Sequence, residues 1–222
     1  MEAIILAGGF GTRLQSVVSE VPKPMAPVAG KPFLTYILDQ LKKHGFTRVI
    51  LAVGYLSEVI ENHFGNNYRE MEIIYSHEYE PLGTGGCIVN AMKHVRDEYV
   101  YVINGDTYFD VNLSAMKLPE EILIACKYMK DASRYGVLDI VDGKVKAFKE
   151  KSLLSEGYIN GGIYIFKKDI FNRFPLNQKF SLEKDFFEKY MNELNIEAYL
   201  SEDYFIDIGI PEDYHKAEVD FK

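Results

Sequence analysis

The sequence predicts an α/β protein with a mixed, mainly parallel sheet flanked by helices and followed by a β-rich portion. The first half alternates short apolar runs with amphipathic stretches. This alternation is typical of βαβ units, whose parallel strands are buried on both faces. The second half changes to closely spaced β-rich segments separated by turn-forming residues.

The first half supplies the parallel strands. We expect them at residues 3–6, 48–53, 72–75 and 99–103, where apolar residues run continuously. We expect helices between them at residues 33–44, 56–64 and 84–94, where apolar residues recur at helical spacing.

The second half is expected to contain strands at residues 122–128, 135–141, 144–148 and 158–166. Asp142-Gly143 has the composition of a hairpin turn between the second and third of these. A helix at residues 181–194 with a partial cap at Ser181, a short strand at 196–200 and a helix beginning at Pro211 complete the order.

Composition restricts the class of protein. The chain is 47% hydrophobic and 26% charged with a net charge of −8, and no repeat or linker divides it, so we expect one domain over residues 1–222. The negative charge argues against nucleic acid or an anionic membrane as the main partner. Cys87 and Cys126 are far apart in apolar contexts, and the N-terminal apolar run is too short for a signal peptide, so we expect a cytoplasmic protein with reduced thiols.

A glycine-rich loop follows the first expected strand directly. It reads Leu6-Ala7-Gly8-Gly9-Phe10-Gly11-Thr12-Arg13-Leu14. Its three glycines let backbone N–H groups surround phosphate oxygens, and Arg13 offers a planar fork of donors. Lys23 lies between Pro22 and Pro24, which stiffen the backbone around an ammonium suited to developing negative charge.

Two common phosphate-binding loops are excluded here. A P-loop needs Lys followed by Ser or Thr after its last glycine, where this chain has Thr12-Arg13. The dinucleotide fingerprint needs glycine where this chain has Leu14, which argues against an NAD-dependent oxidoreductase. A structural turn with a surface arginine stays open as the alternative.

Two aspartates follow apolar runs. Asp106 follows the strand expected at 99–103, so its carboxylate should lie at the carboxyl end of a parallel strand, where ligands bind in α/β sheets. Asp207 has a similar setting after Ile206. Two converging carboxylates suit Mg²⁺, although either Asp could instead cap a turn.

These motifs together resemble those of the sugar-1-phosphate nucleotidylyltransferases. The resemblance is carried, in order, by Gly8-Gly9-Phe10-Gly11-Thr12-Arg13-Leu14, Pro22-Lys23-Pro24, Leu82-Gly83-Thr84-Gly85-Gly86, Asn104-Gly105-Asp106, Arg134-Tyr135-Gly136-Val137, Glu150-Lys151, Asn160-Gly161-Gly162 and Asp207-Ile208-Gly209. It spans nearly the whole chain. It implies a Rossmann-like mixed sheet, with a nucleotide-binding half at about residues 1–110 and a sugar-binding half at about residues 111–222.

The resemblance also implies roles for individual residues. Arg13, Lys23 and Asp106 are expected to be catalytic, and Asp106 and Asp207 to bind Mg²⁺. The expected nucleotide-binding residues are Leu6, Ala7, Gly8, Gly9, Gly11, Thr12, Arg13, Glu78, Gly83 and Thr84. The expected sugar-phosphate-binding residues are Gly136, Glu150, Lys151 and Asn160. Lys149, Glu150 and Lys151 could equally form an exposed charged loop.

Glu78 indicates which nucleotide base the protein binds. A carboxylate only accepts hydrogen bonds, and guanine offers N1–H and N2–H₂ side by side, so Glu78 favours GTP unless it is simply a solvated loop acid. Among short guanylyl-type members, the chain is most similar to those acting on a heptose 1-phosphate. The alternatives are mannose- or glucose-1-phosphate enzymes using GTP, CTP or UTP, or a catalytically silent regulatory subunit. The protein is a possible homo-oligomer.

Overall fold

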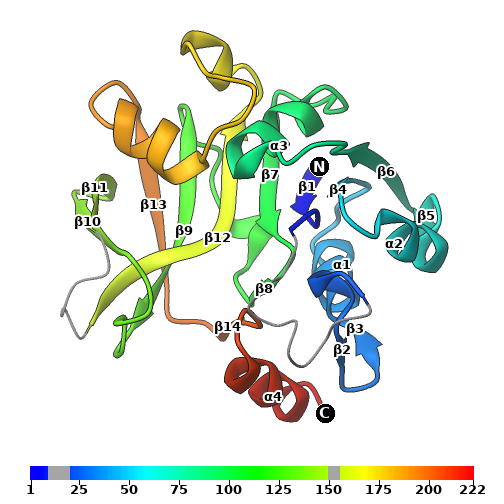
Figure 1. Cartoon of the computed structure of the whole chain (residues 1–222). Coiled ribbons are helices and arrows are strands. Elements are labelled where there is room, and N and C mark those ends of the chain that lie inside the picture. Colours follow the sequence, from blue (N-terminus) through cyan, green and yellow to red (C-terminus); the bar gives the residue numbers. More distant parts are fainter. Residues whose placement is uncertain (10–20, 150–155) are drawn as a thin grey trace.

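A computed structural model describes residues 1–9, 21–149 and 156–222, and a large mixed sheet dominates it (Figure 1). The strands of its first part are β1 (Glu2–Leu6), β4 (Arg48–Val53), β5 (Asn67–Tyr68), β6 (Met71–His77) and β7 (Tyr99–Asn104). Those of its second part are β9 (Ile122–Met129), β10 (Val137–Val141), β11 (Lys144–Lys149), β12 (Gly157–Lys167) and β13 (Ile196–Ser201). The ten strands are ordered β10-β11-β13-β9-β12-β7-β1-β4-β6-β5.

Helices and two small sheets complete the described chain. The α-helices are α1 (Phe33–Lys43), α2 (Ser57–Phe64), α3 (Gly83–Met92) and α4 (Pro211–Asp220). The 3₁₀ turns are η1 (Lys23–Met25), η2 (Leu113–Ala115) and η3 (Ile170–Arg173), and η4 (Leu182–Glu188) is a π-helix. The small sheets pair β2 (Pro27–Val28) with β3 (Lys31–Pro32) and β8 (Thr107–Phe109) with β14 (Phe205–Asp207).

The first half is an α/β unit, as predicted. Strands β7, β1, β4 and β6 lie side by side and parallel, and α1, α2 and α3 connect or flank them. Alternate residues of β1 enter two different cores. Ala3 and Ile5 pack with α1 on one face of the sheet, whereas Ile4 packs with α3 on the other. Burial on both faces explains why these strands are continuous apolar runs.

The sheet as a whole is mixed but not mainly parallel, because the β-rich second half adds mostly antiparallel pairings. Strand β12 is antiparallel to both β7 and β9, β10 is antiparallel to β11, and only β13 runs parallel to β9. For β10 and β11 the physical reason is the expected tight turn, which returns the chain at once, whereas parallel strands need a long crossover. Asp142 and Gly143 have φ values of 50° and 73°, the left-handed pair that such a hairpin turn requires.

The helix predicted at residues 181–194 is shorter and wider than expected. It is the π-helix η4, which ends at Glu188, and Ser181 caps it by accepting a hydrogen bond from the backbone N–H of Lys184 at 3.3 Å. Phe186 and Phe187 are consecutive and both completely buried. A wider turn brings both aromatic rings, together with Leu182, onto the face packed against the sheet.

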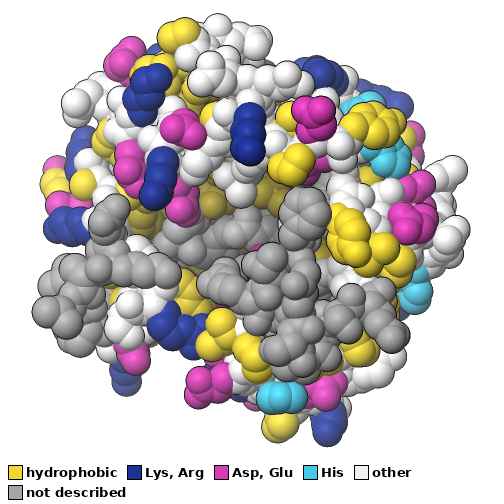
Figure 2. Space-filling model, viewed as in Figure 1, with side chains coloured by type: hydrophobic (Ala, Val, Ile, Leu, Met, Phe, Trp, Pro, Cys, Tyr) yellow, Lys and Arg dark blue, Asp and Glu magenta, His cyan; other side chains and the backbone are white. Residues whose placement is uncertain are grey.

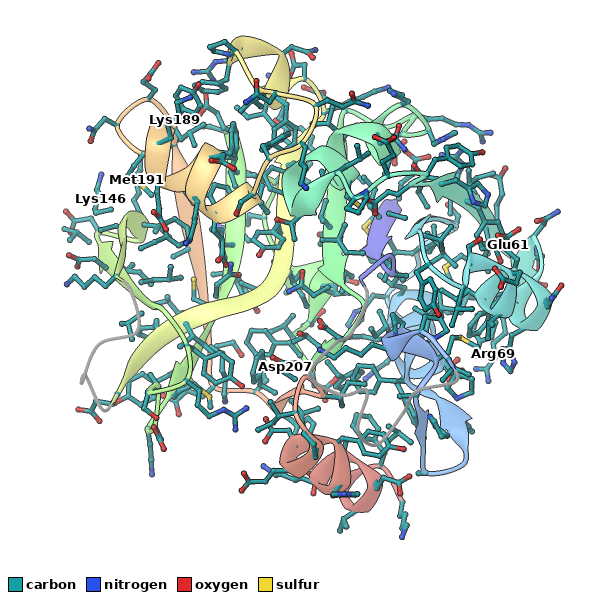
Figure 3. All side chains as sticks on the ribbon, viewed as in Figure 1. Glu61, Arg69, Lys146, Lys189, Met191 and Asp207 are labelled. Carbon is teal, nitrogen blue, oxygen red and sulfur yellow. The ribbon has the colours of Figure 1, made fainter. Side chains whose placement is uncertain are left out.

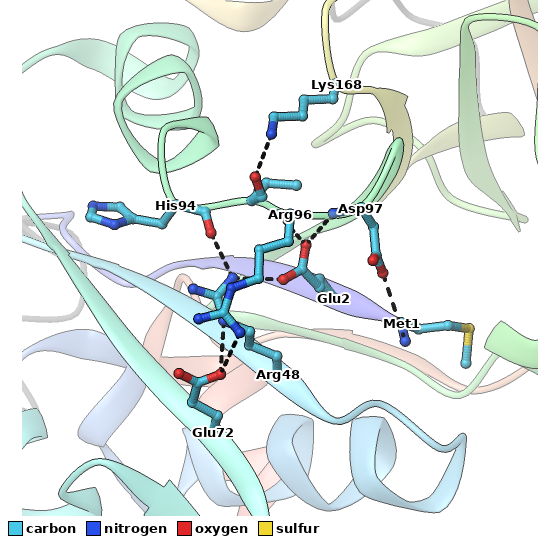
Figure 4. Close-up of polar contacts among 9 residues, drawn as sticks. Met1, Glu2, Arg48, Glu72, His94, Arg96, Asp97 and Lys168 are labelled. Carbon is cyan, nitrogen blue, oxygen red and sulfur yellow. Dashed lines mark hydrogen bonds and ion pairs between the residues drawn. The ribbon is translucent and has the colours of Figure 1, made fainter.

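A buried ionic network fixes the amino ends of β1, β4 and β6, far from the strands' carboxyl ends (Figure 4). The Arg48 guanidinium lies 2.6 Å from Oε1 of Glu2 and 3.0 Å from Oε2 of Glu72. The other oxygen of Glu2 accepts hydrogen bonds from the backbone N–H groups of Arg96 and Asp97 at 2.6 and 2.8 Å. The network therefore neutralises a carboxylate that is only 5% exposed.

The described surface carries charges of both signs. On the face shown in Figure 2, Lys and Arg side chains alternate with Asp and Glu, without a continuous basic patch among the side chains that are drawn. Within the described ranges, no helix combines the length and the apolar character needed to cross a membrane.

Candidate active site

A cleft of about 750 Å³ opens at the carboxyl ends of the parallel strands. Leu6 and Asn104 end β1 and β7, and Gly54 and Glu78 directly follow β4 and β6. The described lining residues are Leu6, Gly8, Gly9, Lys23, Pro24, Gly54, Tyr55, Glu78, Tyr79, Glu80, Pro81, Gly83, Thr84, Cys87, Asn104, Asp106 and Gly209. Ligands bind at this edge in open α/β sheets, so the cleft is the candidate active site.

Lys23, Asp106 and Asp207 converge at this cleft. The ammonium nitrogen of Lys23 lies 2.5 Å from Oδ2 of Asp106 and 3.6 Å from Oδ1 of Asp207. The small β8–β14 sheet brings the aspartates together, because its register pairs Asp207 with Thr107. The backbone N–H of Ile208 also donates to the carbonyl oxygen of Asp106 at 3.0 Å. Residues far apart in the sequence thus form one ionic group.

This ionic group is only partly open to solvent. The side chains of Lys23, Asp106 and Asp207 are 9%, 36% and 23% exposed. Figure 3 labels Asp207 near the middle of the molecule, well away from Lys146 at one edge. Asp207 also accepts a hydrogen bond from the backbone N–H of Gly209 at 2.7 Å. Asp207 therefore caps a turn, as the alternative interpretation has it, and also contacts Lys23.

The two carboxylates suit a divalent cation. In residues 1–9, 21–149 and 156–222, no cluster of three or more His, Cys, Asp or Glu side chains is arranged to hold a metal. Mg²⁺ is commonly bound by only one or two carboxylates, with phosphate and water oxygens filling its octahedron. Asp106 and Asp207 already converge on the cationic nitrogen of Lys23, so this donor set fits Mg²⁺.

Glu78 is part of the wall of the cleft and is half-buried there rather than fully exposed to solvent. Its backbone N–H donates to the carbonyl oxygen of Val53 at 2.8 Å, continuing the β4–β6 pairing. Its Oε2 accepts a hydrogen bond from the backbone N–H of Leu82 at 3.2 Å. Its Oε1 lies so close to Gly8 that a Cβ on that glycine would be only 2.6 Å away.

The segment Leu82–Gly86 contacts the cleft on one side and the second half of the chain on the other. Gly83 has a φ of +70°, and a Cβ there would lie 2.6 Å from the carbonyl oxygen of Phe180. The hydroxyl of Thr84 accepts a hydrogen bond from the backbone N–H of Leu182 at 3.0 Å. Gly83 and Thr84 line the cleft as expected, and the structure adds a second reason for their small size.

The expected sugar-site residues that are described do not line this cleft. Asn160 donates from Nδ2 to the hydroxyl of Tyr164 at 2.7 Å and to Oε1 of Glu183 at 3.1 Å, so the chain itself uses its amide. Gly136 lies where a Cβ would be 3.1 Å from the carbonyl oxygen of Lys149.

Ala7, one of the expected nucleotide-binding residues, is buried beside the cleft, and its N–H donates to the carbonyl oxygen of Ala52. Five expected site residues lie outside the described residues: Gly11, Thr12, Arg13, Glu150 and Lys151.

Sequence reasoning missed several lining residues. Tyr55 and Tyr79 are 53% and 93% exposed and follow β4 and β6, so the strand-end rule that selected Asp106 could also have selected them. Asn104 shares that signal. No sequence signal pointed to Cys87, because a buried thiol in an apolar helix resembles an ordinary core residue until its tertiary neighbours are known.

Comparisons with known proteins agree with this geometry. A family model described as Nucleotidyl transferase matches residues 2–222. The D-glycero-alpha-D-manno-heptose 1-phosphate guanylyltransferase of Aneurinibacillus thermoaerophilus is 52% identical over 223 residues, covering 98% of this chain and 97% of the relative. The protein of the same name from Campylobacter jejuni is 50% identical over 217 residues, covering 97% of both chains.

A solved structure extends the similarity to three dimensions. HddC from Yersinia pseudotuberculosis, complexed with GMP-PN, has a TM-score of 0.88 and 40% sequence identity, covering 100% of this chain and 99% of that chain. The match runs through both the parallel first half and the mixed second half. This chain therefore belongs to the nucleotidyl transferase family.

Proposed function

We propose that this protein transfers the guanylyl group of GTP to D-glycero-α-D-manno-heptose 1-phosphate, giving the GDP-sugar and pyrophosphate. The observation that carries the proposal is the convergence of Lys23, Asp106 and Asp207 at a cleft whose wall contains Glu78. Two relatives of about 50% identity along their whole length bear the heptose guanylyltransferase name, and they support this choice of substrates.

The proposed reaction requires the protein to position the substrates and stabilise charge, and it requires no proton transfer. The attacking phosphate oxygen of the sugar 1-phosphate is already an anion, so it needs no general base. It forms a bond to the α-phosphorus of GTP, and the bond between that phosphorus and the bridging oxygen breaks to release pyrophosphate. The protein must hold the two anions in line and offset their repulsion.

Lys23 and Arg13 would offset the negative charge of the reacting phosphates. The ammonium of Lys23 lies at the edge of the cleft and is held in place by Pro22, Pro24 and two carboxylates, so it is oriented before substrate arrives. Lys23 would stabilise charge developing at the α-phosphate. Arg13, which lies outside the described residues, would hold the departing pyrophosphate.

Asp106 and Asp207 would hold Mg²⁺. When bound, the ion supplies Lewis-acid polarisation of the α-phosphate. The carboxylates would contribute by converging from two segments onto one point, and their shared contact with the ammonium of Lys23 supports this role. Asp207 is further oriented by the N–H of Gly209.

Glu78 would read the base. Its half-buried carboxylate faces the cleft with one oxygen bonded to the N–H of Leu82, which leaves acceptor capacity for the adjacent N1–H and N2–H₂ donors of guanine. Uracil presents a carbonyl at the corresponding edge, which a carboxylate repels. GTP is therefore favoured over UTP.

The two halves would divide the substrates. The Rossmann-like parallel half, about residues 1–110, would bind the nucleotide through the loop that includes Gly8 and Gly9. The half at about residues 111–222 would bind the sugar phosphate through Gly136, Glu150, Lys151 and Asn160. Both cysteines are buried and unpaired, which supports a cytoplasmic reaction.

The test is pyrophosphate release in the presence of Mg²⁺, crossing GTP, CTP, UTP, ATP and dTTP with the 1-phosphates of the heptose, mannose and glucose. We expect release with GTP and the heptose 1-phosphate well above every other pair. Preference for another nucleotide would overturn the role of Glu78 while keeping the transferase. Preference for mannose or glucose 1-phosphate would overturn the assignment of the sugar. No release with any pair would favour the silent regulatory subunit.

A further inference from the structure

Two tyrosines stand exposed at the cleft, beside the proposed base reader. Tyr79 is 93% exposed, more than any other large apolar or aromatic side chain among the described residues, and Tyr55 is 53% exposed. Both line the cleft. An aromatic ring in water is stabilised when a planar ligand covers it. The proposed chemistry at the phosphates uses neither ring, so their place at the cleft calls for a separate explanation.

We propose that Tyr79 is a base-binding residue, whose ring stacks on the face of the guanine while Glu78 reads its edge. The inference rests on the proposed function, because it concerns the nucleotide that the same cleft binds. Stacking contributes affinity rather than identity, since every nucleotide base has a π face. Tyr79 thus binds the base, and Glu78 distinguishes guanine from uracil.

A single turn holds the ring next to the base reader. Oε2 of Glu78 accepts a hydrogen bond from the backbone N–H of Leu82 at 3.2 Å, which closes residues 78–82 into a turn. Tyr79 is the second residue of this turn, and Pro81 restricts the backbone both at its own position and at the one before it. The ring and the carboxylate therefore keep a fixed relation to each other along one short segment.

His77 supports the ring from the strand. The ring centroids of His77 and Tyr79 are 6.1 Å apart, and their planes are inclined by only 21°. Tyr75 continues the row, with its centroid 6.5 Å from that of His77. Nε2 of His77 also lies 3.9 Å from Oε1 of Glu61 in α2, which is labelled in Figure 3. Alternate residues of one strand thus form an aromatic row that ends in Tyr79, whose exposed ring is open to a further planar group.

Glycine backbone forms a flat wall at the same end of the cleft. A Cβ on Gly54 would lie 3.1 Å from the carbonyl oxygen of Gly8, and a Cβ on Gly8 would lie 2.6 Å from Oε1 of Glu78. The two glycines therefore approach each other and the carboxylate more closely than larger residues could. Tyr55 directly follows Gly54 and adds a second ring beside this wall. A flat wall with aromatic rings next to it suits a planar purine.

The test is steady-state kinetics of wild type, Tyr79→Ala, Tyr79→Phe and Leu118→Ala with GTP and heptose 1-phosphate. We expect Tyr79→Ala to raise KM for GTP by about fivefold to fiftyfold, because a base–aromatic contact is lost, and to leave kcat and KM for heptose 1-phosphate within about twofold. Tyr79→Phe keeps the ring and should match wild type. Leu118 is 61% exposed and lies outside the described lining of the cleft, so Leu118→Ala should also match wild type.

The reverse reaction separates the base from the phosphates. It consumes the GDP-sugar, which carries the base, and pyrophosphate, which carries none. Tyr79→Ala should raise KM for the GDP-sugar and leave KM for pyrophosphate unchanged.

Three results would overturn the stacking role and leave the proposed function intact. They are an unchanged KM for GTP in Tyr79→Ala, an equal rise in KM for the GDP-sugar and for pyrophosphate, and an effect of Tyr79→Phe as large as that of Tyr79→Ala. Absence of the reaction in wild type, in both directions, would instead overturn the proposed function and the inference with it.

Discussion

The ammonium of Lys23 lies 2.5 Å from Oδ2 of Asp106, although the two residues are 83 positions apart in the chain. Asp207 approaches the same nitrogen at 3.6 Å. One cation is thus shared by two carboxylates at the carboxyl ends of the parallel strands. The three side chains act as a unit in the chemistry proposed here, so changes at any of them should lower the rate of transfer rather than unfold the protein.

Asp106→Asn should reduce turnover by about a hundredfold to a thousandfold, because it removes the negative charge that faces both Lys23 and the proposed metal. The fold should survive, since Asp207 still lies 3.6 Å from the ammonium of Lys23 and the side chain of Asp106 is 36% exposed. Initial rates and thermal unfolding measure the two effects. Asp110→Asn, an exposed change outside the described lining of the cleft, is the control. Retained turnover in Asp106→Asn would remove this residue from the mechanism.

Lys23→Ala should lower kcat more than it raises KM, because the ammonium is proposed to act on charge that develops in the transition state. We expect a loss of about a hundredfold in kcat. Steady-state kinetics with varied GTP give both constants. Lys42→Ala, which removes a more exposed ion pair with Glu70 at 3.5 Å, should leave both unchanged. A change confined to KM would make Lys23 a ground-state binding residue.

Arg48→Ala should destabilise the fold by about 3 to 5 kcal/mol, because it leaves the buried carboxylate of Glu2 without its charged partner. The free energy of unfolding in urea measures this. Lys167→Ala breaks an exposed pair with Glu98 at 4.0 Å and should cost about 1 kcal/mol or less. Similar losses in the two variants would show that burial of the Glu2–Arg48 pair has no special energetic consequence.

The same network around Glu2 and Arg48 should make the free energy of unfolding depend on pH. Burial alone raises the pKa of Glu2, but the N–H groups of Asp97 and Arg96 and the guanidinium of Arg48 outweigh it and hold the pKa below its ordinary value of 4.5. A lowered carboxyl pKa means that the unfolded chain binds the proton more tightly. The stabilisation is therefore complete above pH 4.5 and is lost as the pH falls through the folded value.

Glu2→Gln is the variant that tests this dependence. It should reduce the part of the unfolding free energy that wild type loses as the pH falls below 4.5. Urea unfolding at a series of pH values in both proteins provides the comparison. Identical pH profiles would mean that other carboxylates account for the acid sensitivity.

Much of the first half could be predicted because its strands are buried on both faces. The expected strand at 48–53 coincides with β4, and the expected helix at 33–44 differs from α1 by one residue. Continuous apolar runs and glycine turns are local signals of this arrangement. Strand order and direction in the second half depend instead on how β12 pairs with both β7 and β9, which no local pattern reveals.

The site was predictable where position along a strand fixes position in space. Asp106 follows β7 and reached the cleft as expected. The contact of Lys23 with Asp106 and Asp207 was not predictable in this form, because it depends on the small β8–β14 sheet, whose strands have only three residues each. The position of Cys87 at the cleft likewise depends on how α3 packs, which the composition of the helix does not determine.

The most direct test of the proposed transfer is to follow an oxygen label. Heptose 1-phosphate carrying ¹⁸O in its non-bridging phosphate oxygens would be incubated with GTP, Mg²⁺ and the protein, and the products would be analysed by ³¹P NMR and mass spectrometry. We predict that all of the label stays in the GDP-sugar, with one labelled oxygen bridging the two phosphorus atoms, and that pyrophosphate carries none. Label in pyrophosphate, or no conversion of GTP, would contradict attack on the α-phosphorus at the cleft formed by Lys23, Asp106 and Glu78.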